Sequence, residues 1–369
     1  MSFAQFFGLA DERRETFVVS PERDPGLLVD LDKLVPFLET RFEQKGSAPQ
    51  AILYGEFGTG KTHALRYVEH VLGPKYAQQP IYFMLSNFGP KSTFSDVHLR
   101  VMNALDPYLP KILAALPDAE TAINDNKRLT EDMKAALRYL KTPNLSPEQR
   151  GTIRIWMMGA GPTPSQARKL GFAGRLLETS GPVELVNFWK GIGELWAKAT
   201  GKRLLLLIDE GEAFQKVTDS QAQASIGTGM RELFDTDNAA VGIFLAANTP
   251  DARKGIHPLQ RADLQSRLVG KTLTLTGLAD PKHIEHFIQG WWQKIGRQDG
   301  TLLEARAVEL IGQRLKEMRD KLSVRQQVAS KPTQRNLMDV LAFIGQQAMT
   351  HGRRPPITEQ DLRAWFFLS

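Results

Sequence analysis

The strongest structural signal in the chain is the segment Ala51-Ile52-Leu53-Tyr54-Gly55-Glu56-Phe57-Gly58-Thr59-Gly60-Lys61-Thr62. Its first four residues form an apolar run that predicts a short buried strand, and residues 55–62 match the pattern GxxxxGK[ST] of a phosphate-binding loop that opens a helix. Glycines allow the backbone to curl so that successive amides face phosphate oxygens. We expect Lys61 to reach the β- and γ-phosphates of a bound nucleotide such as ATP, and the Thr62 hydroxyl to hold Mg²⁺.

A glycine-rich turn without a ligand is the alternative interpretation of this loop. The apolar run before it and the helix-forming residues after it favour phosphate binding, because that function requires a strand, a loop and a helix in this order. His63 follows directly and is grouped with the nucleotide-binding residues by its position, although its side chain is more simply a structural or surface group.

A second apolar strand ends in two acidic residues. Leu204 to Ile208 has the composition of a fully buried strand, and Asp209 and Glu210 follow it. An acidic pair after a strand is a weak signal alone, but a carboxylate beside the phosphates is what Mg²⁺ needs. We therefore expect Asp209 to hold the metal and Glu210 to polarise the attacking water, which favours hydrolysis over passive nucleotide binding.

Four further residues carry polar groups toward the same expected site. Asn248 ends the strand at 241–247 and is either a γ-phosphate sensor or a simple strand-ending turn. Arg261 and Arg267 precede the last expected strand, and each is either an arginine finger reaching a neighbouring subunit's nucleotide or a surface ion pair. Arg335 opens a helix near the end of the chain and could face the nucleotide.

The elements along the chain indicate an α/β fold with a C-terminal helical part. Strands that alternate with helices favour a parallel sheet covered by helices on both faces. The expected strands are 51–54, 81–85, 204–208, 241–247 and 271–275. The helices expected after them are 281–296, 303–322, 333–350 and 358–368.

These segments predict a nucleotide-binding core at residues 1–279 and an all-helical lid at residues 280–369. Lys61 and Asp209 are separated by 148 positions, which is too long for a minimal core. We therefore expect a mostly helical insertion at about residues 108–180, and long insertions of this kind tend to be functional.

In this order, the motifs resemble those of the AAA+ ATPases, at residues ~17–90 and ~200–369. The resemblance implies that Val18 and Val19 wall the adenine site, and that Asn248 is sensor 1. It also implies that Arg335 is sensor 2 and that Arg267, with Arg261 second, is the arginine finger. ATP and Mg²⁺ are the implied cofactors.

Two finer likenesses narrow the family. Residues 357–363, Ile-Thr-Glu-Gln-Asp-Leu-Arg, are similar to the clade of origin-recognition initiators and transposition-regulator ATPases. Residues 155–159 and 166–171 are more loosely similar to ATPases of BREX-type phage-defence systems. Initiators usually continue into a winged-helix domain, which does not follow here, so we expect contacts with the backbone of double-stranded DNA in place of base reading.

Composition and charge set the remaining expectations. The 369 residues include no cysteine, which excludes disulfides, thiolate metal sites and cysteine nucleophiles. The longest Leu/Ile/Val run, 204–208, is too short to span a bilayer, and the charged run 11–15 is unlike a signal peptide, so we expect a cytoplasmic protein. The net charge is +6, and residues 301–369 alone sum to +4, which is a mild indication of a polyanionic partner.

Together these features predict an AAA+ ATPase that couples ATP binding and hydrolysis to assembly of a ring or filament and to engagement of DNA. The setting would be transposition, replication-type loading or phage defence. The alternative is a protein-remodelling or signalling AAA+ ATPase that does not bind DNA, with a protein partner held by the insertion. A site that binds nucleotide without turnover is disfavoured by Glu210.

Overall fold

The computed structural model describes residues 2–9, 11, 14–15, 17, 20–22, 24–25, 31–44, 46–142, 145–235, 238–249, 258–275, 281–295, 301–320 and 334–367. The chain divides into two compact units. One, which we call the sheet unit, comprises Phe37–Leu53 and Val68–Leu273. The other, the helical unit, comprises Met1–Pro36, Tyr54–Tyr67 and Thr274–Ser369.

All five predicted strands are present and form one sheet in the order β2-β3-β4-β1-β5. Their bounds are β1 Gln50–Gly55, β2 Gln78–Met84, β3 Arg203–Asp209, β4 Val241–Ala247 and β5 Thr272–Leu275. β2 pairs with β3 in parallel, with Met84 opposite Asp209, and β3 pairs with β4 in parallel, with Leu204 opposite Val241.

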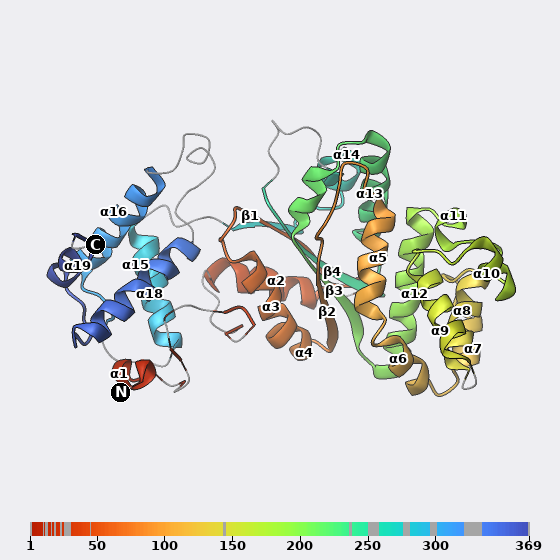
Figure 1. The fold of residues 1–369 in the computed structure, drawn as a ribbon, viewed down its shortest axis with the longest axis horizontal. Helices are drawn as coiled ribbons and strands as arrows, with labels where there is room; N and C mark the ends of the chain where they lie inside the picture. Colours follow the sequence, from red (N-terminus) through yellow and green to blue (C-terminus); the bar gives the residue numbers. More distant parts are fainter. Residues whose placement is uncertain are drawn as a thin grey trace. The chain divides into compact units, whose positions relative to one another are not determined.

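The middle strands of the sheet are mostly apolar because both faces of the sheet are covered. Every residue of β4 is buried, and so is every residue of β1. Figure 1 shows α2 (Leu31–Glu43) and α4 (Gly73–Lys75) on one face, and α5 (Phe94–Leu105), α12 (Pro182–Thr200) and α13 (Ser220–Leu233) on the other. The prediction of an α/β fold with helices on both faces of a parallel sheet is confirmed.

The segment predicted as an insertion is helical. Its helices are α6 Leu109–Ala115, α7 Ala119–Asn124, α8 Glu131–Lys141, α9 Pro147–Met157, α10 Pro164–Lys169 and α11 Leu176–Thr179. Polar residues with side-chain capping bonds begin α7, α8, α9 and α10, namely Asp118, Thr130, Ser146 and Thr163. α6 packs on α12, whose Trp189 and Trp196 are buried, as expected for core residues.

A buried histidine joins this segment to α5 and α12 within the sheet unit. His98 of α5 is fully buried, with Nε2 2.8 Å from the carbonyl oxygen of Met157 at the end of α9. The indole of Trp189 donates to His98 Nδ1 at 2.9 Å, so the proton of the neutral ring lies on Nε2 and is donated to Met157. Burial lowers the pKa of His98 to about 4, which keeps the ring neutral at pH 7.

The helical unit contains the four helices predicted at the C-terminal end. They are α15 Pro281–Lys294, α16 Ala305–Asp320, α18 Gln334–Thr350 and α19 Glu359–Phe367. Their core also takes in aromatic residues from the start of the chain, where α1 spans Phe3–Phe7. The ring of Phe17 lies 4.6 Å from that of Phe7 and 5.2 Å from that of Trp291.

Short elements complete the described chain. They are α3 Lys61–Tyr67, the π-helical turn η1 Val68–Leu72, the 3₁₀ turns η2 Gly211–Lys216 and η4 Pro258–Gln260, and α14 Ala262–Gln265. Within the described ranges, none of the helices has the length and apolar character that crossing a bilayer requires.

Candidate nucleotide site

The loop between β1 and α3 has a backbone that only glycine accommodates easily. Gly58 and Gly60 lie in the left-handed region, with φ of 81° and 92°. At Gly55 a Cβ atom would lie 2.4 Å from the Thr59 hydroxyl oxygen, closer than real Cβ contacts allow. The three glycines of the predicted phosphate-binding loop are therefore required by its geometry.

Lys61 lies across this loop. Its side chain is 7% exposed, and Nζ donates to the carbonyl oxygens of Gly55 at 2.7 Å and Glu56 at 2.9 Å. The Thr59 hydroxyl also donates to Glu56, at 2.9 Å, which ties the two sides of the loop together. These bonds hold a buried cation against the loop's own backbone. Thr62, the next residue, is half-buried.

Arg335 contacts the same loop at two points, both inside the helical unit. Its backbone amide, at the start of α18, donates to the carbonyl oxygen of Gly58 at 3.3 Å. Its guanidinium lies 4.5 Å from the centre of the Phe57 ring, which is 68% exposed. The structure thus brings the predicted sensor 2 residue to the predicted phosphate-binding loop.

His63 bonds to the segment that precedes α2. Its Nε2 lies 2.8 Å from the carbonyl oxygen of Asp24, and burial lowers its pKa, so the neutral ring donates this bond. The Asp24 carboxylate in turn forms a buried ion pair with Arg14. The segment before α2 is therefore fixed to the first turn of α3. Val18 and Val19, the predicted adenine wall, lie outside the described residues.

The acidic pair lies in the sheet unit at the end of β3. Asp209 is 4% exposed, and its two carboxylate oxygens accept separate bonds. Oδ2 accepts from the Tyr82 hydroxyl at 2.9 Å, and Oδ1 accepts from the Glu210 amide at 2.8 Å. Glu210 is exposed and has φ 58° and ψ 36°, a left-handed conformation that is rare outside glycine and concentrated at functional sites.

Tyr82 is a site residue that the sequence did not identify. It lies in the middle of β2, within an apolar run that predicts only a buried strand. Its contact with Asp209 depends on the register between β2 and β3, where Tyr82 is opposite Leu207. No local pattern in the sequence specifies that register.

Asn248 is half-buried and directly follows β4, the strand between β3 and β1 in the sheet order. Asn248 thus lies at the end of the strand next to β3, which carries Asp209.

Both candidate arginine fingers are bound to carboxylates of their own chain. Arg261 makes two bonds to Asp263, at 3.1 and 3.0 Å, and its Cδ atom fills the space next to Gly227. Arg267 donates to Asp235 at 3.3 Å and to the carbonyl oxygen of Asp263 at 2.9 Å. An arginine finger reaching another subunit would have to exchange these partners for phosphate.

The donor groups at the two predicted metal positions are of the right type for Mg²⁺. Thr62 offers a hydroxyl and Asp209 a carboxylate, and Mg²⁺ takes oxygen ligands, commonly one or two from the protein with phosphate and water completing the shell. Among the described residues, no group of three or more His, Asp or Glu could hold a metal ion.

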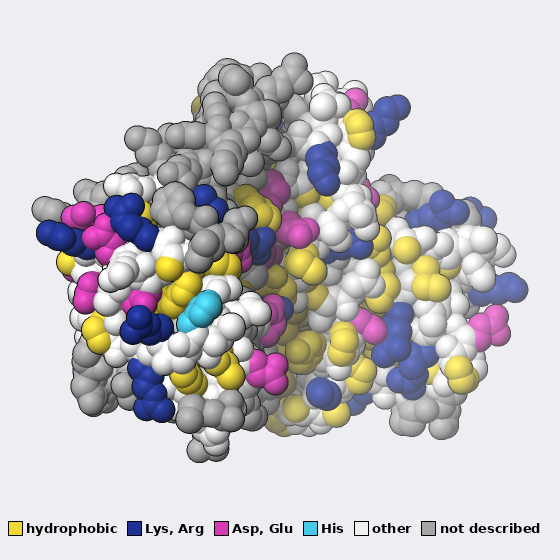
Figure 2. Space-filling view, turned by 60° about the vertical axis from the view of Figure 1, so that its left-hand side comes forward, with side chains coloured by type: hydrophobic (Ala, Val, Ile, Leu, Met, Phe, Trp, Pro, Cys, Tyr) yellow, Lys and Arg dark blue, Asp and Glu magenta, His cyan; other side chains and the backbone are white. Residues whose placement is uncertain are grey.

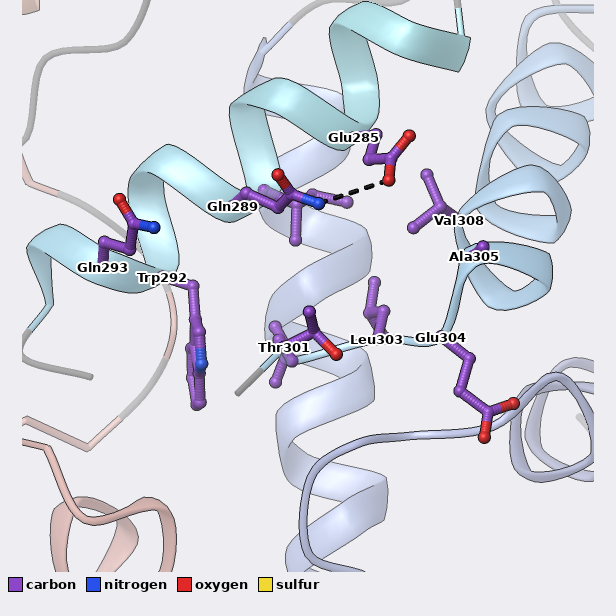
Figure 3. Close-up of a pocket in the computed structure, with 11 residues that line it drawn as sticks. Glu285, Gln289, Trp292, Gln293, Thr301, Leu303, Glu304, Ala305 and Val308 are labelled. Carbon is purple, nitrogen blue, oxygen red and sulfur yellow. Dashed lines mark hydrogen bonds between the residues drawn. The ribbon is translucent and has the colours of Figure 1, made fainter. Parts of the chain in front are cut away.

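A separate cavity of about 340 Å³ lies in the helical unit between α15 and the start of α16. Figure 3 shows Trp292 and the amide side chains of Gln289 and Gln293 on one side of it, and Val308 and Ala305 on another. None of the predicted nucleotide-site residues lines this cavity.

Basic side chains are dispersed over the face of the described part that Figure 2 shows. On the face shown in Figure 2, Lys and Arg side chains lie among Asp and Glu side chains, without one continuous basic area in the described part. Lys91, Arg168, Lys169 and Lys216 are among the exposed basic residues of the sheet unit.

Comparisons with known proteins find only distant likenesses in structure. No family model matches the chain, and no curated protein matches it. Among solved structures, the ORC2 protein of Aeropyrum pernix in its ADP form is 14% identical, with 98% of this chain and 71% of that chain covered and a TM-score of 0.41.

Two further solved structures are similar at the same level. A Walker-type ATPase of Pyrococcus abyssi is 11% identical over 91% of this chain and 72% of that chain, with a TM-score of 0.41. The Cdc6p of Pyrobaculum aerophilum is 14% identical over 91% of this chain and 66% of that chain, with a TM-score of 0.44. Likenesses at this level do not define an activity.

Proposed function

We propose that this protein is an ATPase of the AAA+ type, in which ATP binding and hydrolysis control assembly and engagement of DNA. The observation that carries the proposal is the loop after β1. There, Gly58 and Gly60 hold a left-handed backbone, and a Cβ at Gly55 would crowd the Thr59 hydroxyl. The buried Lys61 lies across this loop with Nζ 2.7 Å from the Gly55 carbonyl oxygen.

The chain's own residues divide the work of the site. The loop amides and Lys61 bind the phosphates. Arg335, at the start of α18, contacts the phosphate end of the nucleotide. Glu210 accepts a proton from the attacking water, and Asn248 orients that water. Thr62 and Asp209 would hold Mg²⁺, which supplies charge neutralisation on the phosphate oxygens.

We expect assembly to depend on an arginine finger. Arg267, or Arg261 in second place, would reach the nucleotide of a neighbouring copy and so link ATP binding to a ring or filament. Arg267 is the better candidate because Arg261 is held by a bidentate pair to the Asp263 carboxylate and packs on Gly227. Arg267 makes one bond to the Asp235 carboxylate and one to the Asp263 carbonyl oxygen. The helical segment 109–179 would recruit an additional protein partner.

DNA is proposed as the assembly's partner, bound through its phosphate backbone. The support is the basic excess of the C-terminal part, where residues 251–300 sum to +3 and residues 301–369 to +4. Transposition, replication-type loading and phage defence are the settings that such an ATPase would serve. Backbone binding predicts little sequence preference and a steep loss of affinity with salt.

The experiment that tests this proposal is measurement of molecular size with a non-hydrolysable ATP analogue, with and without duplex DNA. We expect larger assemblies with the analogue, and a further shift with DNA that is lost at high salt. Assembly that responds to nucleotide and ignores DNA would favour the alternative, a protein-remodelling or signalling ATPase. Absence of any response to nucleotide would contradict both.

A further inference from the structure

The carboxylate of Asp209 is held by a side chain from the neighbouring strand. In the parallel pairing of β2 with β3, Met84 lies opposite Asp209 and Tyr82 opposite Leu207. Tyr82 and Met84 are two positions apart and share one face of the sheet, roughly 7 Å apart along the strand. The length of a tyrosine side chain allows its hydroxyl to reach forward along that face to Asp209 Oδ2, at 2.9 Å.

The second oxygen of the same carboxylate holds the backbone of Glu210. Oδ1 accepts the Glu210 amide at 2.8 Å, and the Asp209 carbonyl oxygen accepts the amide of Leu85 at 3.0 Å. Each carboxylate oxygen can accept two bonds, so one acceptor position on each remains for a cation. The two bonds together fix the rotation of the carboxylate about its last torsion.

The same bonds stabilise the unusual backbone of Glu210. A left-handed conformation is unfavourable at a residue other than glycine. The amide bond to Asp209 Oδ1 compensates part of this cost. Gly211 removes a second obstacle, because a Cβ at that position would lie 2.7 Å from the Ala246 carbonyl oxygen. Rotation of the Asp209 carboxylate would therefore release Glu210 as well.

We propose that Tyr82 is a positioning residue for Asp209 and, through it, for Glu210. This inference rests on the proposed ATPase function, since it concerns the metal-binding carboxylate and the water-activating carboxylate of that site. Tyr82 fixes the carboxylate in the orientation that leaves its remaining acceptor positions for Mg²⁺. In doing so it couples metal binding to the placement of Glu210.

The test is Tyr82→Phe, which keeps the ring and its packing and removes only the hydroxyl. Binding of a fluorescent ATP analogue is measured across a Mg²⁺ titration, and steady-state hydrolysis is measured at saturating Mg²⁺. We expect a roughly 10-fold increase in the Mg²⁺ concentration needed for half-maximal binding, with metal-free nucleotide affinity unchanged. We also expect a lower kcat with an unchanged KM for ATP, since Glu210 is displaced while the loop is not.

The matched control is Tyr76→Phe. The Tyr76 hydroxyl also donates to a carboxylate, that of Glu43 at 3.3 Å, but this pair lies on the surface. We expect wild-type Mg²⁺ dependence for Tyr76→Phe and wild-type thermal unfolding for both variants. A Mg²⁺ dependence of Tyr82→Phe equal to that of the wild type would overturn the inference while leaving the proposed ATPase intact. Failure of the wild-type protein to bind ATP would overturn the proposed function and the inference together.

Discussion

Glu210 combines an exposed carboxylate with a backbone conformation that most residues avoid, directly after the buried Asp209. The local sequence pattern of an apolar strand followed by Asp and Glu predicted the positions of both carboxylates. It could not predict the left-handed turn, because that turn depends on the close approach of Gly211 to β4.

Glu210→Gln tests the proposed proton acceptor. The amide has nearly the same shape as the carboxylate, and the bond to Asp209 comes from the backbone, so the turn and nucleotide binding should persist. Loss of a general base lowers the rate of chemistry by roughly 10²–10⁴-fold. Single-turnover hydrolysis measures this, with Glu120→Gln on the exposed side of α7 as the control. Wild-type single-turnover rates would remove Glu210 from the chemistry.

Phe57 and Arg335 form the contact between the loop and α18. A cation over an exposed aromatic ring contributes about 0.5–1 kcal/mol. We expect Phe57→Ala and Arg335→Ala each to weaken ATP binding, and the double variant to show a coupling energy of that size in a double-mutant cycle. Phe57→Tyr keeps the ring and should bind ATP as the wild type does. Strictly additive effects would show that the ring does not hold the guanidinium during binding.

At the scale of elements, the sequence predicted the strands and the C-terminal helices because each is specified by a continuous local pattern. β4 was predicted at its observed bounds, and the other strands were predicted within three residues. What the sequence left out were contacts between distant segments. The N-terminal aromatic residues Phe3, Phe7 and Phe17 pack into the core of the C-terminal helices, and no periodicity joins those two ends of the chain.

His98 makes the stability of the sheet unit depend on pH. Its folded pKa is about 4, below the ordinary value of 6.5, so the unfolded chain takes up a proton first as pH falls. The stabilisation is complete above pH 6.5 and is lost as pH falls from 6.5 toward 4. Between pH 7.5 and 5.5 we expect a loss of about 1 kcal/mol from this residue.

Chemical denaturation at several pH values measures this dependence. His98→Gln should be less stable than the wild type at pH 7.5, because the bonds to Met157 and Trp189 are altered, but its stability should change less as pH falls. The exposed His351 provides the control, since His351→Gln should keep the wild-type pH dependence. An unchanged slope in His98→Gln would contradict the buried neutral histidine.

At the scale of the whole molecule, the proposed assembly requires residues of one copy to serve the nucleotide of another. A mixture of Arg267→Ala protein with Lys61→Ala protein tests this directly. Each variant alone should hydrolyse ATP slowly, since one lacks the finger and the other cannot bind the phosphates. Interfaces that pair an intact loop with an intact arginine should recover part of the activity in the mixture. Activity that equals the average of the two variants would show that Arg267 acts within its own chain.

The central claim is that the loop after β1 binds the phosphates of ATP through Lys61, and equilibrium ATP binding tests it most directly. We expect Lys61→Ala to bind ATP about 10–100-fold more weakly than the wild type, because a charged hydrogen-bond donor to phosphate is lost. Lys75→Ala, which removes an exposed lysine paired with Glu39, should bind ATP as the wild type does. Wild-type ATP affinity in Lys61→Ala would contradict the account.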